Sequence, residues 1–83
     1  MHMIYPLKLE QQSSDICRVK SSAGLHVGNL KLISGVWKFK AIVYDASGQV
    51  IPGGGPLTDR HNSRFAALDG AEINRVLSTN HSS

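Results

Sequence analysis

The sequence predicts an α+β domain, in which a small twisted antiparallel sheet of four to five strands packs against one short C-terminal helix. Segments that alternate between polar and apolar residues, as half-buried strands do, follow one another between turn-forming residues over most of the chain. Near the end the spacing becomes helical, with Ile73, Val76 and Leu77 on one face. At 83 residues the chain is too short for two hydrophobic cores. We therefore expect one domain over residues 1–78, followed by a frayed polar tail at 79–83.

Two strands are expected in the first twenty residues. Residues 3–10 alternate, and Pro6 places this strand at a sheet edge because proline has no amide hydrogen to donate. A polar break at residues 11–15 separates it from a second alternating segment at 16–20. The second segment contains Cys17, the single cysteine, which we expect to be a buried thiol because one cysteine cannot form an internal disulfide.

A third strand is expected over residues 25–33, after a turn at residues 21–24. Its apolar residues change phase at Gly28 and the residue after it, so we expect a bulge or a break there. The serine and glycine at residues 34–35 then predict a two-residue hairpin turn into the next strand.

The next strand, residues 36–44, has the strongest alternation in the chain. One side is expected to face the core: Trp37, Phe39, Ala41 and Val43. The other side is expected to face solvent: Val36, Lys38, Lys40, Ile42 and Tyr44. A turn at residues 45–48 follows, with Gly48 where a positive φ is needed. Residues 49–51 are therefore expected to fold back as the hairpin partner, which Pro52 ends.

The C-terminal helix is expected over about residues 70–78. Asp69 can cap it by accepting hydrogen bonds from first-turn amides, and Glu72 can reach back to complete a capping box. Such a helix would cover the apolar side of the strongest strand. A longer helix from Asn62 is the alternative, which Gly70 disfavours because glycine costs about 1 kcal/mol in a helix interior.

A glycine-rich segment between two prolines, residues 52–56, is the most unusual part of the sequence. Successive unhindered amides can bind an anion, but neither a lysine-serine pair nor a helix start follows at the offset that a phosphate loop needs. We expect this segment to shape a connection, and we predict no cofactor and no small-molecule ligand.

Composition and charge limit the classes of function. Hydrophobic residues at 41% and charged residues at 18% are typical of a globular protein. Nine Lys and Arg against six Asp and Glu give a net charge of +3, which permits an anionic partner without requiring one. No segment approaches the roughly 18 apolar residues of a membrane span. We expect a soluble, cytoplasmic protein with no membrane partner.

Catalysis and metal binding are weakly supported. Asp59, His61 and Ser63 alternate over one short segment, and a histidine beside a carboxylate could act as a general base in a small hydrolase. Groups that act together usually come from separate elements that fix their geometry, so we expect no enzyme and instead expect His61 to bond nearby backbone. The histidines show no ligand spacing, and we expect no metal site.

The favoured function is a non-enzymatic binding module for nucleic acid. Lys38, Lys40 and Tyr44 share the solvent side of one strand, and Arg18 and Lys20 share a side of another. If those strands are neighbours, they form a basic surface on which cations neutralise phosphates while the ring stacks on a base. The expected nucleic-acid-binding residues are Lys38, Lys40, Tyr44, Arg60, Arg64, Arg18 and Lys20.

The alternative is a protein-interaction or regulatory module. A domain this small can gain stability when exposed strand edges or faces pair between copies. Ile42 and Tyr44 would then form an apolar patch for a protein partner or a homodimer. In that case the lysines of the sheet only keep it in solution and prevent aggregation at the edges.

The order of elements in the last two thirds of the chain is three strands and a helix. This order resembles the double-stranded-RNA-binding domain and the three-stranded arm-site-binding domain of tyrosine recombinases, at the level of topology. The lysine cluster at the start of the helix in the first family is missing here, where the helix begins with the acidic turn of residues 69–72. We carry over no functional residue from either family.

Overall fold

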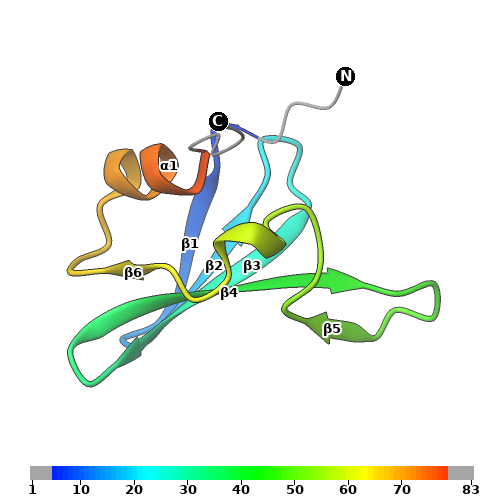
Figure 1. Ribbon diagram of the computed structural model, residues 1–83, viewed down its shortest axis with the longest axis horizontal. Helices are drawn as coiled ribbons and strands as arrows, with labels where there is room; N and C mark the ends of the chain where they lie inside the picture. The colour runs from blue at the N-terminus through cyan, green and yellow to red at the C-terminus, as the bar shows by residue number, and fades with distance from the viewer. Residues whose placement is uncertain (1–4, 79–83) are drawn as a thin grey trace.

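The computed structural model describes residues 5–78, which form a six-stranded antiparallel sheet and one C-terminal helix (Figure 1). The α+β fold class predicted from the sequence is therefore confirmed. The expected tail at 79–83 and residues 3–4 of the expected first strand lie outside the described residues. The elements in chain order are β1 (Lys8–Ser13), β2 (Ile16–Lys20), β3 (His26–Ile33), β4 (Val36–Tyr44), β5 (Val50–Pro52), the 3-10 helix η1 (Thr58–Arg60), β6 (Arg64–Phe65) and α1 (Gly70–Ser78).

β4 has the most pairing partners in the sheet, because β3 lies along one edge and two strands share the other. The first four strands follow one another as antiparallel neighbours, and β5 and β6 share the other edge of β4. β5 pairs with residues 42–44 of β4, and β6 pairs with residues 37–38. Between them the side chain of His61 completes the edge, since its Nδ1 accepts a hydrogen bond from the N–H of Ala41 at 3.0 Å.

The two predicted hairpin turns of β4 are confirmed. Ser34 and Gly35 have φ values of 52° and 80°, as a two-residue turn of type I′ requires. Gly48 has a φ of 88°, and its N–H bonds to the carbonyl of Asp45 at 3.0 Å. Both turns therefore place a glycine, Gly35 or Gly48, in the left-handed region.

The predicted bulge in β3 is also present, one residue before the expected position at Gly28 and Asn29. Pairing with β2 shifts by one residue between Gly28 and His26, which leaves Val27 as the extra residue. Val27 and Leu30 can therefore both be buried in the core, although they are three residues apart. Gly28 fits here because a Cβ at this position would collide with the ring of Phe39.

The hydrophobic core lies between α1 and one face of the sheet. Ile73 and Leu77 of the helix are buried in the same cluster as Phe39 and Leu30 of the sheet. The predicted placement of the helix is thus confirmed. Burial of each such side chain stabilises the fold by about 1.5–3 kcal/mol relative to exposure.

The start of α1 agrees with the sequence only in part. Asp69 caps the helix, since its Oδ1 accepts two first-turn N–H groups at 3.1 and 3.3 Å. The prediction of a capping box is wrong, because the carboxylate of Glu72 instead bonds to Arg75, with 2.7 Å between Oε2 of Glu72 and Nη2 of Arg75. The longer helix from Asn62 is also wrong, because β6 forms in that stretch and pairs with β4.

The boundaries of the first strand were misplaced by the alternation. β1 begins at Lys8 and continues to Ser13, through most of the expected polar break at residues 11–15. Almost all its side chains are exposed, so backbone pairing with β2 holds it rather than burial of one face. A strand of this kind needs no apolar alternation, and its polar residues resemble those of a loop.

The alternation of β4 holds as far as residue 41 and then changes. Three predicted core residues are buried: Trp37, Phe39 and Ala41. The prediction that Ile42 faces solvent is wrong, since it is 5% exposed, whereas Val43 is only half-buried. The glycine-rich segment folds back onto this part of the strand, where a Cβ on Gly55 would collide with the Ile42 carbonyl and one on Gly54 would lie 3.1 Å from Val43.

Candidate functional site

The sheet face turned away from α1 carries most of the positive charge of the protein. Seven of the nine Lys and Arg residues lie on this face of the described strands, and Glu10 is the one Asp or Glu residue within those strands. The other acidic residues lie in turns, in η1 or at the start of α1. We name this surface the basic face; its cations are Lys8, Arg18, Lys20, Lys31, Lys38, Lys40 and Arg64.

Three of these cations form a row across adjacent strands. Lys31 on β3 lies directly opposite Lys38 on β4, and Lys38 lies directly opposite Arg64 on β6. Directly opposite residues share a face, and neighbouring strands are about 4.8 Å apart, so the row spans about 9–10 Å. Like charges in these positions repel, and an anion bound across them would relieve that repulsion. We call these three residues the cation row.

No carboxylate of the described residues neutralises the cation row. Glu10 lies 3.2 Å from the Nζ of Lys20 and 4.0 Å from the Nη1 of Arg18, on the same face but on the edge strand β1, which β2 separates from the row. Within residues 5–78, no carboxylate lies at ion-pair distance from any member of the row. The cations of the row, on β3, β4 and β6, therefore have no ion-pair partner among the described residues.

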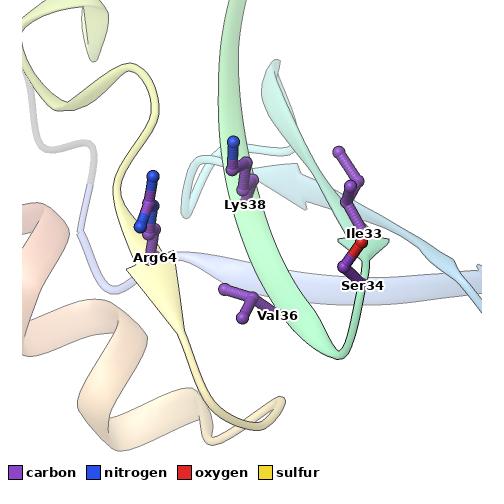
Figure 2. A pocket seen from close by; sticks show the side chains of 5 residues that line it. All are labelled: Ile33, Ser34, Val36, Lys38 and Arg64. Carbon is purple, nitrogen blue, oxygen red and sulfur yellow. The ribbon is translucent and has the colours of Figure 1, made fainter.

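A shallow pocket of about 230 Å³ opens beside the cation row. Figure 2 shows Lys38 and Arg64 extending in the same direction from adjacent strands, with Val36 below them. Ile33 and Ser34, at the β3–β4 turn, complete the lining. The pocket therefore offers two cationic groups, one hydroxyl and two apolar side chains. This combination complements a phosphate joined to a sugar, because the cations can bond the oxygens while the apolar groups contact carbon.

Lys38 and Arg64 are the two predicted site residues that the structure brings together. Lys40 is the next cation along the same side of β4, and its Nζ donates to the side-chain amide oxygen of Asn62 at 2.6 Å. Tyr44 lies at the other end of β4 from the row. The predicted residues of β4 thus lie along one strand but do not form one compact cluster.

The remaining predicted residues do not join the row. Arg18 and Lys20 lie on β2, and Lys38 lies on β4. The expectation that these two strands are neighbours is wrong, because β3 lies between them. Arg60 is the last residue of η1, ahead of the loop that leads into β6, so it does not belong to the paired strand residues that form the row. Burial raises the pKa of the Tyr5 hydroxyl, and the charge of Arg60 counteracts that rise.

Lys31 is the site residue that the sequence interpretation missed. It lies on a strand whose apolar pattern changes phase, so alternation alone did not assign its face. The two-residue turn at residues 34–35 contained the missing information. In such a hairpin, residues at equal distances from the turn are paired, which places Lys31 opposite Lys38.

Two of the three residues considered for catalysis, His61 and Ser63, bond to the backbone through their side chains. His61 accepts the N–H of Ala41, which confirms the expectation that its ring is bonded to nearby backbone. Ser63 donates its hydroxyl to the carbonyl of Arg60 at 2.7 Å. These bonds fix the loop that leads into β6, and so they hold Arg64 beside β4.

Two other kinds of feature are not found in the part of the chain that the structure describes. No three His, Cys, Asp or Glu side chains there lie together as metal ligands would. No helix there is long and apolar enough to cross a membrane.

No family model, curated protein or solved structure matches this chain. The function is therefore inferred from the geometry of the basic face.

Proposed function

We propose that this protein is a small non-enzymatic module that binds nucleic acid through its phosphates, with the cation row as the principal contact. The observation that carries the proposal is the alignment of Lys31, Lys38 and Arg64 without a neutralising carboxylate in the described chain. The row spans about 9–10 Å across three strands. One strand of B-form nucleic acid carries about three phosphates over that length, at roughly 3.4 Å per phosphate along the axis.

The pocket beside the row supports the same class of ligand. Lys38 and Arg64 line it with donors that suit phosphate oxygens, and the guanidinium can bond two oxygens at once. Ile33 and Val36 line it with carbon, against which a sugar can pack. Both features read the sugar-phosphate backbone, so the proposal predicts little dependence on base sequence.

The salt dependence of binding tests the proposal. Each neutralised phosphate releases counterions, and log K therefore falls with log salt by about 0.7 to 0.9 per contact. Three contacts predict that affinity falls about 20- to 40-fold between 50 and 200 mM salt. Fluorescence anisotropy with a labelled oligonucleotide of mixed sequence measures this directly. Failure to bind at low salt, or binding that salt does not weaken, contradicts the proposal.

Lys38→Gln is the sharpest variant, because it removes the central charge of the row and keeps most of the side-chain length. With two contacts left, the same change in salt should weaken binding only about 7- to 12-fold. Arg75→Gln is the matched control, since it removes one charge from α1, where Arg75 pairs with Glu72. If both variants reduce the salt dependence equally, net charge rather than the row accounts for binding.

Protein interaction is a second candidate function, favoured by the exposed apolar surface around β5. This surface consists of Tyr44, which is 42% exposed, Val50, which is 47% exposed, and Ile51, which is 44% exposed. Ile42, which the sequence interpretation placed in such a patch, is buried instead. No charged residue lies between Asp45 and Asp59, so this edge lacks the charges that usually prevent strand pairing. Light scattering distinguishes the candidates: a tight dimer indifferent to polyanions favours protein interaction, and a monomer with salt-dependent binding favours nucleic acid.

A further inference from the structure

The far end of the basic face carries a pair of rings that the cation row does not use. They belong to His26 on β3 and Tyr44 on β4, with centroids 5.9 Å apart and planes inclined by 47°. Tyr44 is 42% exposed, so much of its ring is accessible to a ligand. It lies six residues beyond Lys38 on the same side of β4. At roughly 3.3 Å per residue, the ring lies about 20 Å from the row.

The bulge in β3 places His26 on the basic face. Val27 and Leu30 are three residues apart, and the bulge allows both to face the core. His26 and Asn29, also three residues apart, therefore both face the opposite side, where they bond to each other. β-bulges commonly redirect a side chain beside a functional site, and this one brings an imidazole next to Tyr44.

Hydrogen bonds hold both rings in place before any ligand binds. The Nε2 of His26 lies 2.8 Å from the Oδ1 of Asn29, and its Nδ1 lies 2.9 Å from the hydroxyl of Tyr44. Since the amide oxygen can only accept, Nε2 donates, and in the neutral ring Nδ1 accepts the hydrogen of the Tyr44 hydroxyl. A ring fixed in this way loses little conformational entropy when a ligand stacks on it. Asn29 lies opposite Lys40, which connects the ring pair to the cations of the face.

We propose that Tyr44, held by His26, is a base-stacking site, and that the ligand of the basic face is therefore a single-stranded nucleic acid. The inference rests on the proposed function. In a duplex each base is covered by its neighbours, whereas an unpaired base can turn onto an exposed ring. A nucleic-acid strand that runs along β4 places phosphates at Lys38 and Arg64 and a base at Tyr44. The span of about 20 Å suits a strand within the site size of about 4–16 nucleotides known for single-strand binding.

Oligomers that differ only in their bases test the inference on the unmodified protein. Anisotropy compares labelled oligothymidine of about twelve nucleotides with an abasic oligomer of the same length, which keeps every phosphate. A hairpin duplex is the third probe, and oligouridine with its own abasic counterpart distinguishes RNA from DNA. We expect the base-bearing single strand of at least one sugar type to bind about tenfold more tightly than its abasic counterpart, and more tightly than the duplex.

Variants of Tyr44 then localise the stacking. Tyr44→Ala should reduce the affinity for oligothymidine about tenfold, to the affinity of the unmodified protein for the abasic oligomer. The affinity of the variant for the abasic oligomer itself should be unchanged. Tyr44→Phe keeps the ring and should keep most of the affinity. Neither variant should alter the salt dependence, because the ring contributes no charge, whereas Lys38→Gln should reduce it. Circular dichroism and thermal unfolding check that each variant is folded.

The outcomes separate this inference from the proposed function. Equal affinity for base-bearing and abasic oligomers, with binding that salt weakens, overturns the stacking site and leaves the phosphate contact in place. A preference for base-bearing oligomers that survives Tyr44→Ala in a folded variant also overturns it, because the bases must then bind elsewhere. If no oligomer binds at low salt, the proposed function fails and this inference fails with it.

Discussion

The two faces of the sheet share the same strands and differ in their chemistry. On the side of α1, Phe39 and Leu30 are fully buried, at 0% exposure. On the other side, the adjacent residues Lys38 and Lys31 carry charges that no carboxylate of the described chain neutralises. Strand alternation separates the two environments by a single residue. Stability therefore depends on one face and, by our proposal, ligand affinity on the other, so substitutions at neighbouring positions should have separable effects.

The largest effect is expected in the core. Phe39→Ala should lower the free energy of unfolding by about 3–5 kcal/mol, because it leaves a cavity among side chains that cannot fully collapse. Lys38→Gln, one residue away, should change it by less than about 0.5 kcal/mol. Urea unfolding followed by the fluorescence of Trp37 measures both. Losses of similar size at the two positions would mean that the two faces are not independent.

A substitution in the glycine-rich segment should have the next largest effect. Gly55 has a φ of 94°, and an added Cβ would also collide with the carbonyl of Ile42. Gly55→Ala should therefore cost about 2–4 kcal/mol of unfolding free energy. Gly48→Ala is the matched control, since Gly48 has a φ of 88° but open space around it; it should cost about 1–2 kcal/mol. Equal losses would show that the close approach to β4 contributes nothing.

The imidazole of His61 should contribute less, because one side-chain hydrogen bond to the described residues depends on it. His61→Ala leaves the N–H of Ala41 without its acceptor in the middle of β4, which should cost about 1–2 kcal/mol. Hydrogen exchange provides a local measurement: the Ala41 amide should lose protection while the Phe39 amide, which bonds to Ser63, keeps it. Unchanged protection of Ala41 would mean that another group satisfies this amide.

The smallest effect concerns the pH dependence of stability. Burial raises the pKa of the Cys17 thiol, so above the ordinary thiol pKa of about 8.5 the unfolded chain binds fewer protons than the folded protein. The thiol should therefore contribute a fall in unfolding free energy as pH rises from 7.5 to about 9.5. Cys17→Ala is the reference, since its stability should fall less over the same range. A steeper fall in the variant contradicts the direction assigned to this pKa.

The parts of the fold that the sequence predicted correctly are those governed by local chemistry. The glycine at residue 48 required a positive φ, Asp69 supplied a helix cap, and the phase change at Gly28 required a bulge. β1 was misplaced because an exposed edge strand is held by backbone pairing, which leaves no apolar pattern. β6 was missed for a related reason: two residues are too few to show a period.

The basic face was harder to predict, because it depends on which strands are neighbours. Lys38 and Arg64 were chosen for their residue types, and the structure pairs them. Lys31 and His26 were missed because their faces follow from hairpin register and from the bulge, which a single strand does not reveal. Arg60 does not join Arg64 in the row although the two are only four residues apart, because Arg60 ends η1 and a turn separates it from β6.

Removal of the whole cation row tests the separation of the two faces most directly. The variant Lys31→Gln/Lys38→Gln/Arg64→Gln should lose nearly all salt-dependent binding of an oligonucleotide, since each lost contact lowers the slope of log K against log salt by about 0.7 to 0.9. Its unfolding free energy should stay the same or rise, because three like charges no longer lie opposite one another. An unchanged slope, or affinity and stability that fall together, would contradict the separation of binding from stability.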